Sequence, residues 1–161
     1  MTIKLNVGCG DKLVDGDEWL NVDCRKIYPE TASFLRHDIL RLKEKFKNNT
    51  ADEIMLSDVI EHFWKPDGEK LMQDCRDILK RGGLMTIKTP EIGLLLEYSK
   101  NRCHMDVAHR WYGGQEYSTN VHMFVWPKKQ LIEFIEKVLK LKVKSVITKE
   151  STNIEIEAVK I

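Results

Sequence analysis

The connection between the first two predicted strands limits what this chain can fold into. Residues 3–8 (IKLNVG) and 18–23 (EWLNVD) are apolar runs of strand-like length, and the first ends in glycine. Residues 9–17 between them are acidic and contain the pairs D-G and G-D, which favour turns. No amphipathic helix of useful length fits into that interval. We therefore expect a strand, a glycine turn and a second strand, with the first helix short or missing.

The remainder of the chain alternates between short apolar runs and helical patterns. Strands are predicted within residues 32–39, 52–58 and 84–90, and helices at residues 42–47, after Pro66 and after Pro127. The sequence KRGG is expected to close the helix after Pro66, residues 91–126 read as irregular, and two alternating strands joined by a turn complete the chain. This order predicts an α/β fold with a mostly parallel sheet, helices on both faces and an antiparallel terminal strand.

The composition is that of one soluble globular domain, residues 1–161. The net charge of +1 gives no electrostatic reason to expect nucleic acid or a membrane as a partner, and the lysine-containing stretches read as solvated faces. No apolar run approaches the roughly 20 residues that span a bilayer, and the N-terminus lacks the features of a signal peptide. The four cysteines are scattered without a C-x-x-C pair, so we expect reduced thiols and a cytoplasmic protein.

Glycines and a carboxylate follow the first two predicted strands. Gly8 and Gly10 end the first strand, where the absence of a side chain lets the backbone approach a ligand closely. Asp23 ends the second strand, and its carboxylate can accept both hydroxyls of a ribose. Ligands of such sheets bind beyond the carboxyl ends of the strands. The pattern indicates a nucleoside site, although a glycine turn after a strand is also common without any ligand.

The next two predicted strands also end in polar residues. Asp38 with Ile39 follows the third strand, where the carboxylate can accept from an adenine amino group and the isoleucine can cover the ring. Ser57 and Asp58 end the fourth strand at the same edge. For any one of these aspartates, a helix cap or a turn is the alternative interpretation.

Two kinds of nucleoside cofactor fit this edge. A dinucleotide needs a third glycine and a helix N-terminus for its pyrophosphate, and both are missing here. The acidic turn that follows Gly10 instead suits a zwitterionic or cationic ligand such as S-adenosylmethionine. A nicotinamide-dependent oxidoreductase is therefore disfavoured.

Five motifs occur in the order found in class I S-adenosylmethionine-dependent methyltransferases. These motifs are LNVGCGDK, WLNVD, RHDIL, DEIMLSDVIEHF and LKRGGLMTIKTPE. With the short first connection and a YGGQEY…H segment, the chain resembles a small subfamily of predicted methyltransferases that are often linked to polysaccharide or surface-glycan pathways. The resemblance implies a Rossmann-like sheet, S-adenosylmethionine as the cofactor and methyl transfer as the reaction.

The resemblance also implies roles for individual residues. Carried over by position, it puts Gly8, Cys9 and Gly10 against the methionine portion of the cofactor, Asp23 at the ribose, Asp38 with Ile39 at the adenine, and Ser57 with Asp58 at the methionine end. Glu61 and His62 match an acid–histidine pair of the family. The departure from the family is the first helix, whose loss would leave the amino-acid tail of the cofactor more exposed.

The acceptor is expected to bind under residues 91–126, which follow the fifth strand. A hydroxyl acceptor benefits from a general base, and neutral histidine is the usual choice near pH 7. The candidates for that base are His62, His104, His109 and His122, of which His62, His109 and His122 are preferred. Polar and flat side chains of the segment suit a small acceptor such as a sugar, and the candidates for contacting it are Arg110, Trp111, Tyr112 and Gln115.

Three alternatives stay open. The cluster of Cys103, His104, Asp106 and His109 matches no established zinc spacing, so no metal is predicted. The aromatic residues of the acceptor segment could instead form a dimer surface, since such residues are enriched at interfaces. A non-catalytic domain that binds the cofactor or a partner with the same fold is the second functional hypothesis.

Overall fold

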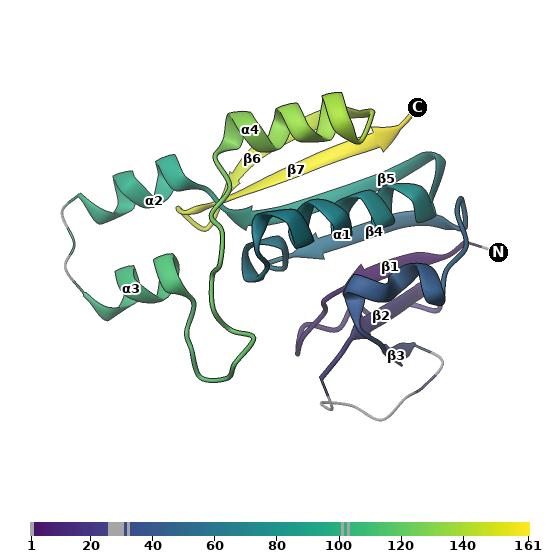
Figure 1. Cartoon of the computed structure of the whole chain (residues 1–161), viewed down its shortest axis with the longest axis horizontal. Coiled ribbons are helices and arrows are strands. Elements are labelled where there is room, and N and C mark those ends of the chain that lie inside the picture. Colours follow the sequence, from purple (N-terminus) through teal and green to yellow (C-terminus); the bar gives the residue numbers. More distant parts are fainter. Residues whose placement is uncertain (1, 26–30, 32, 101, 103) are drawn as a thin grey trace.

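The computed structural model describes residues 2–25, 31, 33–100, 102 and 104–161. A seven-stranded sheet in the order β3-β2-β1-β4-β5-β7-β6 forms its body (Figure 1). In chain order the elements are β1 (Lys4–Val7), β2 (Trp19–Asp23), β3 (Phe34–Arg36), η1 (Ile39–Glu44), β4 (Ala51–Ser57), η2 (Ile60–His62), α1 (Lys65–Ile78), β5 (Leu79–Pro90), α2 (Ile92–Ser99), α3 (Met105–Tyr112), α4 (Lys128–Glu133), η3 (Phe134–Val138), β6 (Leu141–Lys149) and β7 (Asn153–Lys160).

The strand order confirms the predicted sheet. Strands β1 to β5 pair in parallel, whereas β7 lies antiparallel between β5 and β6. The carboxyl ends of β1, β2 and β4 therefore meet at one edge, next to α3 and the loop that follows it (Figure 1). No described helix is long and apolar enough to cross a membrane.

The core lies on one face of the sheet. Leu5, Ile54, Met85 and Ala158 are register neighbours across four strands, and all four are buried in one cluster with the apolar side chains of α1, α4 and η3. We expected helices on both faces. Among the described residues, however, η1, α1 and α4 all lie in front of the sheet in Figure 1.

A loop lies on the opposite face of β1 and β2 in place of the first helix. Asn6 and Asn21 alternate with core residues of their strands, so their side chains point away from the core. Asn21 accepts from the Val14 backbone N–H at 2.8 Å and donates to the Val14 carbonyl at 3.0 Å. Asn6 donates to Asn21 Oδ1 at 2.8 Å and to the Lys12 carbonyl at 2.9 Å. Two buried asparagines thus hold the connection by hydrogen bonds.

Removing one asparagine tests this docking. We expect Asn21→Ala to lower the free energy of unfolding by about 1–3 kcal/mol, because the part-buried Val14 N–H and carbonyl lose their partners. Hydrogen exchange of the amides in residues 11–17 should also become faster. Asn48→Ala, which changes an exposed asparagine, is the matched control and should be nearly neutral. A loss for Asn21→Ala no larger than that of the control would contradict the docking.

Two predictions of local structure were incomplete. Residues 91–126 contain the helices α2 and α3. The Glu91 side chain caps α2 by accepting from the Leu94 N–H, and Trp111 of α3 donates to Ser99 Oγ at 3.0 Å. The KRGG sequence lies inside β5 and does not close α1, because α1 ends at Ile78 and β5 begins at once, with Leu79 paired to Ala51.

Candidate functional site

Gly8 and Gly10 follow β1, and a different neighbour explains the need for glycine at each position. Both adopt left-handed backbone conformations, with φ of 70° at Gly8 and 56° at Gly10. A Cβ atom on Gly8 would lie 2.8 Å from a methyl group of Val59, so Gly8 allows the turn to pack against the chain after β4. A Cβ on Gly10 would instead meet the flexible guanidinium of Arg25. Gly10 is buried beneath that side chain.

Asp23 joins the ends of β1 and β2. Its carboxylate is only 6% exposed and accepts from the Gly10 N–H at 2.8 Å and from the Arg25 N–H at 2.9 Å. The structure thus brings the predicted glycine and the predicted carboxylate together. An ionised carboxylate has about four acceptor positions, so Asp23 keeps capacity for a ligand hydroxyl. Its assignment to the ribose stays a prediction.

Arg25 is a member of this edge that the sequence did not reveal. Its guanidinium lies 3.3 Å from Asp23 Oδ1 and 5.0 Å from the centre of the Tyr117 ring. The side chain therefore connects the end of β2 to the loop after α3. No motif singles out this arginine, because its partner Tyr117 is distant in the sequence.

The predicted adenine residues lie beside the glycine turn. Ile39 is buried, with its Cδ1 atom near Gly8. Asp38 caps η1, accepting from the Leu40 N–H at 3.0 Å, which is the alternative role considered for it. Cys9 is buried between the two glycines, and burial raises the pKa of its thiol to about 12. This thiol is therefore not a nucleophile near neutral pH.

Ser57 and Asp58 lie at the end of β4, and the Asp58 carboxylate forms ion pairs with two lysines. Asp58 has a left-handed backbone (φ 56°) and accepts from Lys12 at 3.2 Å and from Asn153 at 2.8 Å. Lys88 also lies 3.4 Å from its carboxylate. Burial acts to lower the pKa of Lys88, but its contacts with Glu150 and Asp58 raise it overall. Ser57 donates to Asp58 at 3.3 Å. The predicted pair Ser57–Asp58 is thus fixed at the edge by residues from three other segments.

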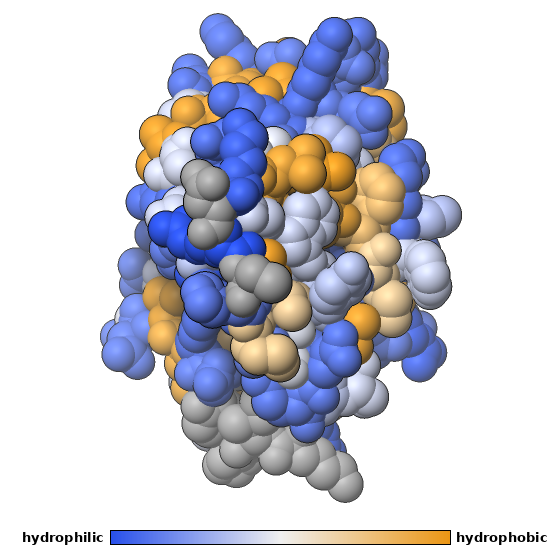
Figure 2. Space-filling model, turned by 90° about the vertical axis from the view of Figure 1, so that its left-hand side faces the viewer, coloured by the Kyte–Doolittle hydropathy of each residue, from blue (hydrophilic) through white to orange (hydrophobic). Residues whose placement is uncertain are grey.

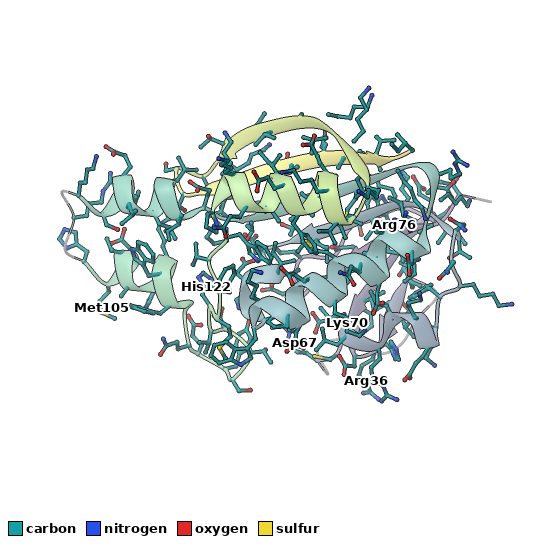
Figure 3. All side chains as sticks on the ribbon, turned by 45° about the horizontal axis from the view of Figure 1, so that its top comes forward. Arg36, Asp67, Lys70, Arg76, Met105 and His122 are labelled. Carbon is teal, nitrogen blue, oxygen red and sulfur yellow. The ribbon has the colours of Figure 1, made fainter. Side chains whose placement is uncertain are left out.

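Two histidines that are distant in the sequence lie close together, and they line the same cavity as Asp58. The rings of His62 and His122 lie 5.1 Å apart, and Glu61 is buried next to them. Figure 3 shows His122 between α3 and the start of α1. Burial lowers the pKa of His62, and burial together with His62 lowers the pKa of His122 to about 4. Both rings are therefore neutral at pH 7.

A cavity of about 380 Å³ opens above these residues. It lies between the ends of β4 and β5, the helix α3 and the turn between β6 and β7. Among the predicted residues, His62, His109, Arg110 and His122 line it, with Asp58. Sequence reasoning missed Asn120, Thr152 and Asn153 on its wall, since these are polar residues in turns without any motif.

The other acceptor candidates lie outside the cavity wall. Trp111 packs against α2 through its bond to Ser99, Tyr112 is 61% exposed, and Gln115 hydrogen-bonds through its backbone to Asn120. Apolar surface gathers in the upper half of Figure 2, at the level of α2, where Leu96 is exposed. Such surface is compatible with the dimer alternative, which stays a prediction.

Among the described residues, the histidines and acids of α3 form no metal-type cluster. Cys103 lies outside the described residues. In the part of the chain that the structure describes, the group of such side chains whose donor atoms come within 4.8 Å of one another is Glu61, His62 and His122.

Comparisons with known proteins agree with this geometry. Residues 13–87 match the family model of the methyltransferase domain. No curated protein sequence matches the chain. The fold is similar to that of a protein from Pyrococcus horikoshii OT3, with 18% identity, a TM-score of 0.67, and 98% of this chain and 81% of that chain covered.

Two further solved structures carry informative names. A SAM-dependent methyltransferase from Archaeoglobus fulgidus has 14% identity and a TM-score of 0.64, with 99% of this chain and 86% of that chain covered. The 1,6-didemethyltoxoflavin-N1-methyltransferase of Burkholderia thailandensis, solved with its substrate and S-adenosylhomocysteine, has 14% identity and a TM-score of 0.68, with 98% and 70% covered. The family model covers just under half of the chain, and the likeness to these structures shows that the chain has the Rossmann-like fold of class I S-adenosylmethionine-dependent methyltransferases.

Proposed function

We propose that this protein transfers a methyl group from S-adenosylmethionine to a hydroxyl of a small acceptor, with a saccharide as the preferred class. The observation that carries the proposal is the cavity of about 380 Å³ that adjoins the glycine edge and is walled by polar side chains. Its volume suits a small molecule. The glycan association of the subfamily that the sequence resembles supports the saccharide.

The residues at the edge fit the cofactor. Asp23 would accept from the ribose, and Ile39 beside Gly8 would cover the adenine. A methionine tail carries an ammonium and a carboxylate, and the Lys12–Asp58 pair offers one charge of each sign at 3.2 Å. Where the cofactor binds, it supplies a methyl group that is already activated on a positively charged sulfur.

The chemistry left to the protein is alignment and proton removal. Methyl transfer is an in-line displacement, so the acceptor oxygen must point along the methyl–sulfur axis. The oxygen forms its new bond to carbon as the sulfur–carbon bond breaks, and the bonding pair stays on the sulfur. The hydroxyl proton must leave the oxygen, and the neutral rings of His62 and His122 line the cavity where it would go.

Thermal unfolding with S-adenosylmethionine, S-adenosylhomocysteine and NAD in parallel tests the cofactor. A ligand at about 100 times its dissociation constant adds roughly 2.7 kcal/mol, which should raise the midpoint by roughly 5–10 °C at this chain length. We expect that shift with the two sulfur compounds and none with NAD. A shift with NAD alone would overturn the proposal.

The second functional hypothesis predicts a different pair of results. A domain that binds the cofactor without catalysis would show the thermal shift and transfer no labelled methyl group to any member of an acceptor panel. We therefore expect transfer from radiolabelled S-adenosylmethionine to at least one saccharide of that panel. Transfer to none would favour the non-catalytic domain.

A further inference from the structure

Three side chains of the type that bind metal ions converge at the floor of the cavity. Glu61 and His62 belong to η2, and His122 follows α3, yet their donor atoms lie within 4.8 Å of one another. The Met123 N–H donates to the Glu61 carbonyl at 2.7 Å, and the His122 N–H donates to the Tyr112 carbonyl at 3.0 Å. The backbone therefore holds the two segments in this arrangement without any ligand.

Hydrogen bonds orient both imidazole rings. Nδ1 of His62 lies 3.1 Å from the Val121 carbonyl oxygen, and Nδ1 of His122 lies 3.1 Å from that of Arg110. A carbonyl oxygen only accepts, so Nδ1 carries the proton in each ring. The Nε2 atom of each neutral ring then keeps its lone pair. Histidines that ligate metals are commonly oriented by such a bond from their other nitrogen.

Glu61 supplies independent support for a cation. The residue is 1% exposed, and its Oε2 atom accepts from the Thr89 hydroxyl at 2.9 Å. Its other oxygen, Oε1, has no hydrogen-bond partner among the described residues. A buried carboxylate oxygen without a partner is costly unless a positive charge or a donor meets it.

We propose that Glu61, His62 and His122 bind one divalent transition-metal ion. Two imidazole nitrogens and one carboxylate oxygen suit Zn²⁺, Mn²⁺, Fe²⁺ or Co²⁺, whereas Mg²⁺ and Ca²⁺ prefer oxygen ligands throughout. Two ligands of a tetrahedral zinc ion lie about 3.3 Å apart, so donor atoms that lie up to 4.8 Å apart must approach by as much as about 1.5 Å when they bind. Asp58 is already paired with Lys12 and Asn153 and is not part of the ligand set.

The ion would face the acceptor cavity. Three protein ligands leave coordination positions open, as in catalytic metal sites, and Arg110, Asn120 and Thr152 line the space in front of them. A bound divalent ion lowers the pKa of a hydroxyl that it coordinates. With Nε2 of His62 and His122 on the ion, these rings would not accept the proton themselves, and the ion would take over their part in activating the hydroxyl. This use of the ion rests on the proposed methyl transfer, whereas the binding of the ion does not.

Calorimetry on untagged protein, freed of metal by a chelator, tests the site. Titration with Zn²⁺, Mn²⁺ and Co²⁺ in the absence of cofactor and acceptor should give one bound ion per chain for at least one metal. The visible absorption of bound Co²⁺ should report nitrogen and oxygen ligands. Absence of binding for all three metals would overturn the proposal, even if the cofactor binds.

Variants decide whether these residues are the ligands. We expect His122→Ala to weaken metal binding by at least about 100-fold, because it removes one ligand from a surface segment without disturbing the core. His37→Ala is the control, since His37 is not among the residues that line the cavity and its ring hydrogen-bonds to the Arg41 carbonyl; its affinity should stay within about twofold. Equal affinity of His122→Ala and the parent would overturn the assignment.

Glu61→Gln separates the metal from a purely structural role. The neutral amide should leave the folded protein intact and abolish the rise in unfolding temperature that the metal causes in the parent. An unchanged rise would overturn the role of Glu61. Metal binding without a response to S-adenosylmethionine would support this site and count against the proposed function.

Discussion

We expect Lys160→Met to destabilise the protein by about 2–4 kcal/mol. Lys160 is 7% exposed at the end of β7, and its Nζ donates to the Arg76 carbonyl at 2.8 Å, the Leu79 carbonyl at 2.6 Å and Asn49 Oδ1 at 2.9 Å. Carbonyls at a helix C-terminus have no partner within the helix, and a cation is favourable there. Methionine keeps the length of the side chain and removes all the donors.

The midpoint of thermal unfolding should fall by roughly 5–12 °C at this chain length. Burial lowers the pKa of Lys160, which shows that removing its ammonium from water costs free energy. The stability lost in Lys160→Met is therefore smaller than the summed energies of its hydrogen bonds. Lys142→Met, on the exposed side of the neighbouring strand β6, is the matched control. Equal midpoints for the two variants would show that Lys160 does not stabilise the end of α1.

The second large effect concerns the cofactor. We expect Asp23→Ala to weaken S-adenosylhomocysteine binding by about 1–3 kcal/mol, which is about 5- to 150-fold in the dissociation constant. The substitution removes the proposed acceptor of the ribose hydroxyls and also frees Arg25 and the Gly10 N–H. Isothermal titration calorimetry measures the change directly.

Asp17→Ala is the control for Asp23→Ala, because Asp17 is an exposed acid of the same connection. Circular dichroism must show that both variants are folded at the temperature of the titration. An affinity of Asp23→Ala within about twofold of the Asp17→Ala value would contradict the ribose assignment and would leave Asp23 with the structural role of holding Gly10.

The edge of the site was predictable because parallel strands share a direction. Once residues 3–8, 18–23 and 52–58 are recognised as strands, their carboxyl ends must meet at one edge, and so must Gly10, Asp23 and Asp58. The absence of the first helix was predictable from turn residues alone.

Contacts between distant loops were not predictable. The His62 ring bonds to the Val121 carbonyl and the His122 ring to the Arg110 carbonyl, and no sequence pattern predicts these contacts. The helices α2 and α3 have eight residues each, and each is fixed by partners outside itself, such as the Trp111–Ser99 bond. Short helices of this kind depend on tertiary packing more than on their own sequence.

The alternation of residues within the strands indicates that helices cover one face of the sheet. A parallel strand buried on both faces is apolar throughout, whereas a strand with one solvated face alternates. In β7, Ile154 and Ile156 are buried while Glu155 and Glu157 are partly exposed. The expectation of helices on both faces gave this alternation too little weight.

The one-sided sheet also has a consequence for how the sequence can diverge. In β4 and β5, core residues such as Ile54, Leu56, Met85 and Ile87 alternate with partly buried residues such as Met55 and Thr86. Selection for stability therefore acts on alternate residues of the same strand. Related chains would be expected to keep apolar residues at the strand positions that face the core and to vary the alternate positions. The two faces of one sheet would therefore accumulate substitutions at different rates.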